Sequence, residues 1–351
     1  MELALVRAIT EGREDLALAT IIEVKGSSPR HPGTKMLVGA KAGPVGTVGG
    51  GRGEARALEA CRASLAERCA ALLRVEMVGS DIIGPDMVCG GSNTMLVEFL
   101  GDRAPYRSAQ ERLARGERVL LVKRILAPGP GPAEVAVALL DQDGAVVCGA
   151  AELTDLATRA LSDGQPRFDE ASGTFYDPLF PEEKLLILGG GHVAKALADL
   201  APALGFAVTV VDDRPEFIAP GRFAEGVRTI QSVFEPAIAA FPFDCATYAV
   251  ILTRGHLLDL ACVRAVLDRP YRYAGFMGSA RKTRLVIEQV RKEGFDPAKV
   301  TALCGPIGLD IGAETPGELA VAIMAELIAV RRNAGLLAGL QRDRESRRNK
   351  P

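Results

Sequence analysis

From Lys184 onward, short apolar runs alternate with longer stretches in which apolar residues recur every three or four positions. The short runs, rich in Val, Ile and Leu, predict buried strands, and the periodic stretches predict helices. The predicted strands cover residues 184–188, 207–213, 248–253 and 273–278. The predicted helices cover 193–204, a stretch after Asp259, and 281–293. Because strands and helices alternate, we expect an α/β domain with a doubly wound parallel sheet over residues 184–335.

The last predicted helix has its own start signal in the sequence TPGE, residues 315–318. Thr315 is a good N-cap, Pro316 fits the first helical position, and Glu318 completes a capping box. The stretch 318–330 is apolar and rich in alanine. It either buries against the sheet or pairs with a second chain, and the second arrangement would give a homodimer.

The first half of the chain mixes strands, turns and isolated helices, which predicts an α+β module over residues 1–178. The predicted strands cover 16–24, 34–39, 72–78, 94–100, 118–126 and 134–140. The predicted helices cover 1–14, 54–71 and 108–115. We find no internal repeat. A stretch with prolines and acids, residues 176–184, is expected to link the two domains, and residues 336–351 to form a polar tail.

Charge and composition exclude several classes of partner. The 351-residue chain has a formal net charge of -2 and a pI near 6.1, so no electrostatic footprint for nucleic acid or an anionic membrane is present. An early acidic amino-terminal stretch and the lack of a long apolar run predict a cytoplasmic protein. The seven cysteines form no CxxC pair, and three histidines are too few to complete a structural zinc site. We expect reduced thiols, several of them buried.

The stretch LLILGGGHVAKAL fits the glycine fingerprint of dinucleotide-binding turns and predicts a Rossmann-like domain. Gly189 and Gly191 follow a predicted strand and open a helix, whose backbone N–H groups suit a phosphate. Asp212 ends the next strand, where an acid accepts a hydrogen bond from a ribose hydroxyl. His192 is either a ligand contact or a side chain packed beside the turn. His256 follows the carboxyl end of another strand, where open sheets bind ligands, and we assign it to the site.

Several longer motifs, in order along nearly the whole chain, resemble the XdhC/CoxI family, the accessory proteins of xanthine dehydrogenase and related molybdenum hydroxylases. In the first half they are GSSPRHPGTKMLV, GTVGGGRGEARALEA and VCGGSNTMLVEF. In the second half they are ILGGGHVAKALADLAPALGFAVTVVDDRPEF, LTRGHLLDL, GFMGSARKT and GPIGLDIGAETPGELA. Arg254 and Cys304 depart from the family pattern, so contacts at these two positions carry over less directly.

The resemblance implies a cofactor chaperone rather than hydride transfer. Proteins of this family bind the molybdenum cofactor, as molybdopterin or its cytidine dinucleotide form. They support its sulfuration with a cysteine desulfurase and pass it to the apo-hydroxylase. Two alternatives follow from the glycine turn alone: an NAD(P)-dependent oxidoreductase, and a regulatory protein that senses a nucleotide. An accessory factor without turnover of its own is the interpretation that we favour.

Cys89 is the residue best suited to hold molybdenum or sulfur in such a transfer, because the thiolate is the reactive and metal-binding form of cysteine. Gly90 and Gly91 follow it and are placed to present backbone N–H groups that stabilise the anion. The alternative is that Cys89 fills a small pocket beside a glycine bulge.

Two loops of the first module are further candidates for cofactor contacts. Ser27, Ser28 and Arg30 offer two hydroxyls and a guanidinium for phosphate or pterin oxygens, or form an ordinary turn. Three consecutive glycines either hold an anion at a helix start or make a tight turn without a ligand. These are Gly49, Gly50 and Gly51.

We expect the cofactor to lie between the two modules. In this arrangement Cys89 of the first module faces the Gly189 turn, Asp212 or His256 of the second.

Overall fold

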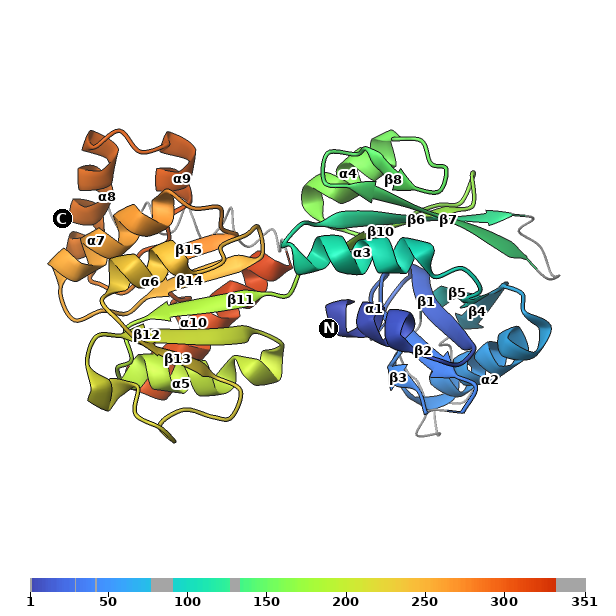
Figure 1. Ribbon diagram of the computed structural model, residues 1–351, viewed down its shortest axis with the longest axis horizontal. Coiled ribbons are helices and arrows are strands. Elements are labelled where there is room, and N and C mark those ends of the chain that lie inside the picture. Colours follow the sequence, from blue (N-terminus) through green and yellow to red (C-terminus); the bar gives the residue numbers. More distant parts are fainter. Residues whose placement is uncertain (1, 29, 42, 77–90, 127–132, 333–351) are drawn as a thin grey trace. The chain divides into compact units, whose positions relative to one another are not determined.

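The computed structural model describes residues 2–28, 30–41, 43–76, 91–126 and 133–332. The chain divides into two compact units, Met1–Pro181 and Glu182–Pro351, called here the first and the second unit (Figure 1). None of the helices in the described ranges has the length and apolar character that a membrane crossing requires.

The second unit contains a five-stranded parallel sheet in the order β13-β12-β11-β14-β15. Its strands are β11 (Lys184–Leu188), β12 (Ala207–Asp212), β13 (Arg228–Gln231), β14 (Thr247–Ile251) and β15 (Tyr273–Phe276). The predicted doubly wound parallel sheet is therefore confirmed. The sequence pattern misses β13, because this edge strand, RTIQ, has no apolar run and is mostly exposed.

Helices cover both faces of this sheet (Figure 1). One face packs against α5 (His192–Leu200) and α10 (Pro316–Arg331). The other packs against α6 (Phe234–Ala240), α7 (His256–Leu267), α8 (Ala280–Lys292) and α9 (Pro297–Ala302). The capping box of α10 is confirmed, since Thr315 accepts from the Glu318 N–H and Glu318 accepts from the Thr315 N–H. Of the two arrangements expected for α10, it adopts the first and buries against the sheet and α5.

The first unit consists of two halves with the same order of elements. The first half contains α1 (Glu2–Glu11), β1 (Leu16–Lys25), β2 (Lys35–Gly39), β3 (Val45–Gly46), α2 (Gly51–Glu67), β4 (Ala71–Glu76) and β5 (Ser92–Phe99). The second contains α3 (Ala104–Ala114), β6 (Val119–Leu126), β7 (Glu134–Asp141), β8 (Val146–Cys148), α4 (Asp155–Asp163), β9 (Arg167–Asp169) and β10 (Thr174–Leu179). The two antiparallel sheets have matching strand orders, β3-β2-β1-β5-β4 and β8-β7-β6-β10-β9.

The expectation of no internal repeat is therefore wrong at the level of topology. The strands of the two halves occupy equivalent positions in their sheets, although no sequence motif recurs between the halves. In each half, an acid on the last strand lies opposite a leucine of the first strand: Glu98 opposite Leu18, and Asp177 opposite Leu121. The repeat is thus visible in strand register and not in sequence identity.

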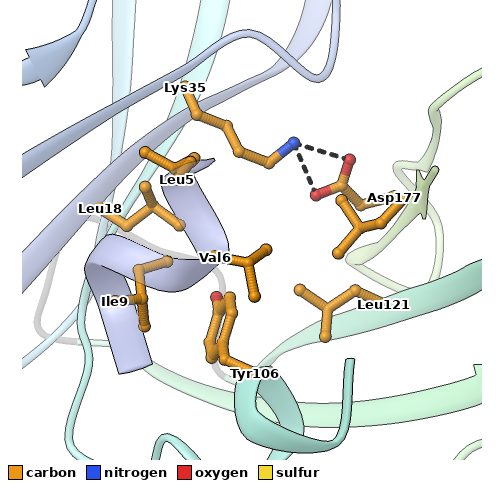
Figure 2. Close-up of a pocket in the computed structure, with 9 residues that line it drawn as sticks. Leu5, Val6, Ile9, Leu18, Lys35, Tyr106, Leu121 and Asp177 are labelled. Atoms are coloured by element: carbon orange, nitrogen blue, oxygen red, sulfur yellow. Dashed lines mark hydrogen bonds and ion pairs between the residues drawn. The ribbon is translucent and has the colours of Figure 1, made fainter. Parts of the chain in front are cut away.

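Each buried acid pairs with a lysine of the other half. Glu98 pairs with Lys123 of β6, and Asp177 pairs with Lys35 of β2 at 2.9 Å between Oδ2 and Nζ. Figure 2 shows the second pair beside apolar side chains of α1 and the two sheets. A cavity of about 10 Å³ beside it has room for about one water, so it belongs to the core and not to a ligand site. The crossed ion pairs join the two halves.

Two predicted boundaries are wrong. Residues 174–179, partly assigned to a linker, form β10, whose side chains are all buried. Pro178 is tolerated there because β9 pairs only with residues 174–176, so at Pro178 one side of the strand needs no N–H donor. The helix expected over 54–71 begins at Gly51 and ends at Glu67, because Arg68 turns left-handed with φ 54° and β4 starts at Ala71.

Candidate functional site

The glycine turn of the second unit lies at the point where the order of strands reverses. β11 and β14 are neighbours, but the helices that follow them, α5 and α7, cover opposite faces of the sheet. Open α/β sheets bind ligands at this position, beyond the carboxyl ends of the strands. Gly189 has φ +107°, and a Cβ there would lie 2.4 Å from the Leu252 carbonyl oxygen. The turn therefore packs directly against the end of β14.

Asp212 is brought to the glycine turn, as predicted, but its partners belong to the protein. Oδ2 accepts from the Gly190 N–H at 2.7 Å, and the carboxylate forms a bidentate pair with Arg214. Burial alone would raise the pKa of Asp212, but the hydrogen bonds from Arg214 and the Gly190 backbone outweigh it and hold the pKa below its usual value. Asp212 thus stays ionised and fixes the turn.

At the N-terminus of α5, this site is open to a ligand. Gly191 is the N-cap, no side chain caps the helix, and a Cβ at Gly191 would meet no atom within 4 Å. Backbone N–H groups of the first helical turn therefore remain for a ligand. The His192 side chain is exposed rather than packed beside the turn. His256 is the first residue of α7, directly beyond β14, as predicted from sequence.

Ion pairs that the sequence patterns did not predict hold the loop between β14 and α7. Asp259 is 1% exposed, accepts from the Thr253 hydroxyl at 2.6 Å, and pairs with Lys282 of α8. Arg254 of the same loop pairs with Asp213 at 2.8 Å, which joins the loop to the end of β12. An acid inside the first turn of an otherwise apolar helix, as in HLLDLAC, was the available signal.

In the first unit, a carboxylate of the protein already occupies the glycine turn at residues 49–51. Glu54 of α2 accepts from the N–H groups of Val48 (3.2 Å) and Gly50 (3.1 Å) and from the Thr47 hydroxyl. The Thr47 hydrogen bond, opposed by burial and supported by the backbone donors, holds the pKa of Glu54 below its usual value. Of the two interpretations, the contacts favour a tight turn over an anion site, since the donors facing Glu54 are taken.

Glu54→Gln is expected to lower the free energy of unfolding at neutral pH by about 0.5–1 kcal/mol, because the amide is a weaker acceptor and solvent screens the site. A lowered pKa means that the carboxylate stabilises the fold above about pH 4.5, its ordinary value, and loses this effect as pH falls through the folded-state value. The free energies of unfolding of the parent and of Glu54→Gln, measured in urea, should therefore become equal at acid pH. Glu59→Gln, on the exposed side of α2, serves as the control, and a gap independent of pH would contradict the assignment.

The loop with Ser27, Ser28 and Arg30 lies beside the segment that follows Cys89 in the sequence. A Cβ at Gly91 would lie 2.2 Å from the Ser27 carbonyl oxygen, so Gly91 is required by the close approach of the loop. The Ser28 hydroxyl accepts from the Arg30 N–H at 3.4 Å, and Arg30 is exposed.

Cys89 and Gly90 themselves lie outside the described residues, as does the predicted tail 336–351. The expectation of buried thiols is confirmed for Cys61, Cys262 and Cys304. Burial raises the pKa of Cys61 to about 12, which makes it an inert thiol. Within the part of the chain that the structure describes, no group of three or more His, Cys, Asp or Glu side chains could hold a metal ion.

Comparisons with known proteins match both units. Residues 9–76 match the model of the XdhC and CoxI family, and residues 185–327 match the model of the XdhC Rossmann domain. A relative from Bacillus subtilis (strain 168), named as a probable subunit of xanthine dehydrogenase, is 27% identical over 94% of this chain and 97% of its own length. The molybdenum cofactor insertion chaperone PaoD of Escherichia coli (strain K12) is 25% identical over 93% of this chain and 86% of its own.

The fold matches a solved structure along nearly its whole length. The crystal structure of a xanthine dehydrogenase from Bacillus halodurans superposes with a TM-score of 0.75 at 24% identity, over 95% of this chain and 96% of that one.

Proposed function

Since the chain belongs to the XdhC and CoxI family, we propose that it binds the molybdenum cofactor and inserts it into a molybdenum hydroxylase of the xanthine dehydrogenase type. The observation that carries this proposal is the full-length similarity to a protein named a molybdenum cofactor insertion chaperone. The match includes both units, so it is not explained by a shared Rossmann domain alone. The cofactor is the cargo of the protein, and a hydroxylase is its recipient.

The first turn of α5 is the part of the second unit that suits the phosphate of this cargo. Its N–H groups have no side-chain cap, and the space beside Gly191 is open. His192 is exposed at the same helix start, and His256 begins the neighbouring helix α7. We do not include Gly49, Gly50 or Gly51 as anion ligands. The Gly49 and Gly50 N–H groups donate to the Thr47 hydroxyl and to Glu54, and the Glu54 carboxylate at this turn repels a further anion.

In the first unit, we assign Cys89 as the residue that binds the molybdenum or sulfur of the cofactor. The residues assigned to further cofactor contacts are Gly90, Gly91, Ser27, Ser28 and Arg30. The close packing of Gly91 on Ser27 supports a common site for these two segments. A thiolate supplies a soft ligand that releases as well as binds. We further propose that a cysteine desulfurase supplies the sulfido ligand while the cofactor is bound, before transfer to the hydroxylase.

Cofactor content after gel filtration tests the proposal. The purified full chain is incubated with molybdenum cofactor, free ligand is removed, and molybdenum and oxidised pterin are measured. We expect roughly one cofactor per chain. The Cys89→Ser variant should bind about tenfold more weakly or worse, since even the loss of a partner outside the metal's own ligands costs about 10- to 100-fold. Cys69→Ser, at the half-buried thiol after α2, is the control and should bind like the parent.

The two levels of the proposal fail separately. No cofactor on the parent chain, and no activation of an apo-hydroxylase, would refute the chaperone function. Equal binding and equal activation by the parent and Cys89→Ser would keep the chaperone function and refute the role of Cys89.

A further inference from the structure

The carboxylate of Asp212 has no lone pair left for a ligand. Oδ2 accepts from the Gly190 N–H at 2.7 Å and from Arg214 Nη2 at 3.0 Å. Oδ1 accepts from the Arg214 backbone N–H at 3.0 Å and from its Nε at 2.9 Å. A carboxylate has about four lone-pair positions, and all of them are filled in a residue that is 1% exposed. Where dinucleotide-binding domains place a ribose hydroxyl, this chain places its own arginine.

Arg214 is itself held in place by an aromatic ring. Its guanidinium carbon lies 3.6 Å from the centroid of Phe217. The Phe217 carbonyl oxygen lies so close to the turn that a Cβ at Gly190 would be 2.6 Å from it. Arg222 Nη2 adds a hydrogen bond of 3.0 Å to the Gly190 carbonyl oxygen. Residues 214–222 therefore cover the glycine turn on the side of β12.

We propose that Arg214 is a specificity-determining residue that closes the ribose subsite of this Rossmann domain. A nicotinamide dinucleotide then cannot dock in the usual way, and the turn accepts ligands that leave Asp212 untouched and reach only the open side at Gly191. The ligand class is a phosphate ester without a ribose bound at the end of β12. This inference concerns the second unit alone and does not depend on the cargo proposed above.

The same geometry disfavours NADP as well as NAD. An arginine near this strand end often receives the 2′-phosphate of NADP, which needs free guanidinium donors. Asp212 takes the Nε donor of Arg214 and one Nη2 donor, and the guanidinium lies over the Phe217 ring, so only the Nη1 donors and the second Nη2 donor are left for a phosphate. A 2′-phosphate on these donors would lie near the ionised Asp212 carboxylate, and the two anions repel each other. The hydroxyl therefore finds no free acceptor on Asp212, and its phosphate ester meets an arginine whose charge is already paired.

Fluorescence titration of the full chain with NADH and NADPH tests the inference. The parent should show no saturable binding up to about 1 mM, the weak end of the affinity scale. Arg214→Ala frees one lone-pair position on Oδ1 and one on Oδ2, because only the backbone donors of residue 214 and Gly190 remain. We expect this variant to bind NADH at least about tenfold more tightly, the effect of one hydrogen bond to a charged acceptor. Adding Asp212→Ala should abolish this gain, because the acceptor is then absent.

Arg222→Ala is the matched control. It removes a contact between residues 214–222 and the turn but leaves the Asp212 carboxylate filled, so no gain in NADH affinity is expected. Saturation of the parent by either nucleotide in the micromolar range would overturn the inference without any variant. A folded Arg214→Ala protein with no gain would also overturn it. If that variant melts early, Arg214→Met, which keeps more of the side chain over Phe217 and has no N–H donor for Asp212, is measured in its place and judged by the same outcomes.

Discussion

Replacing Lys123 with methionine is expected to destabilise the first unit by about 3–5 kcal/mol, the usual effect of removing one partner of a buried ion pair. Lys123 is fully buried, and its ammonium group pairs with Glu98, which is 2% exposed. Methionine keeps most of the length of the lysine side chain. The loss of stability therefore measures the cost of leaving the Glu98 carboxylate unpaired, rather than the cost of a cavity. Urea unfolding combined with hydrogen exchange over β5 and β6 would measure the effect in this unit separately from the second.

The double variant Lys123→Met with Glu98→Leu is the control for this prediction. Replacing both charges by apolar groups of similar size is often neutral or stabilising, so most of the lost stability should return. A single variant that costs less than about 1 kcal/mol, or a double variant as unstable as the single one, would contradict the view that the crossed pair compensates two buried charges. Lys35 and Asp177, the other crossed pair, predict the same pattern.

The duplication of the first unit could not be predicted from the sequence. Six of its strands, β1, β2, β4, β5, β6 and β7, were predicted from their apolar runs, because that signal is local, whereas β3, β8, β9 and β10 were missed. The repeat itself rests on register: Glu98 and Asp177 occupy equivalent positions, but their lysines, Lys123 and Lys35, come from non-equivalent strands. A charged residue within each of the runs VLLVKRIL and TMLVEF was the available signal, since buried charges are rare without a partner.

The candidate site was predicted where it follows from the order of strand, turn and helix along the chain, and not where the conformation of individual side chains decides. The strand, the glycine turn and the helix start are contiguous, so their place at the carboxyl edge of the sheet was predictable. The role of Asp212 was not, because Arg214 and Phe217 fold back onto it. Likewise, the glycines before α2 fit an anion site until the Gly50 N–H is seen to donate to Glu54 and the Gly49 N–H to Thr47.

Gly189→Ala is expected to destabilise the second unit by roughly 2–6 kcal/mol, from a backbone conformation that costs an alanine about 1–3 kcal/mol and from overpacking of similar size. The residue has φ +107°, and the new Cβ would lie 2.4 Å from the Leu252 carbonyl oxygen. Leu252 directly follows β14 and its N–H donates to the Leu188 carbonyl oxygen of the central strand β11, so this backbone cannot move aside as the end of a flexible side chain can. Hydrogen exchange over β11 and β14 should show the loss, while the first unit stays unchanged.

Gly191→Ala, in the same fingerprint, separates structure from ligand binding. Its φ is -64°, and a Cβ there meets no atom within 4 Å, so a change of less than about 1 kcal/mol in stability is expected. If Gly189→Ala and Gly191→Ala destabilised the protein equally, the geometry described for the turn would be wrong. Because the protein itself does not require glycine at position 191, a loss of cofactor binding in a stable Gly191→Ala protein would have to come from the ligand. That result would place the phosphate on the open side of the turn, the side that Arg214 and Phe217 leave free.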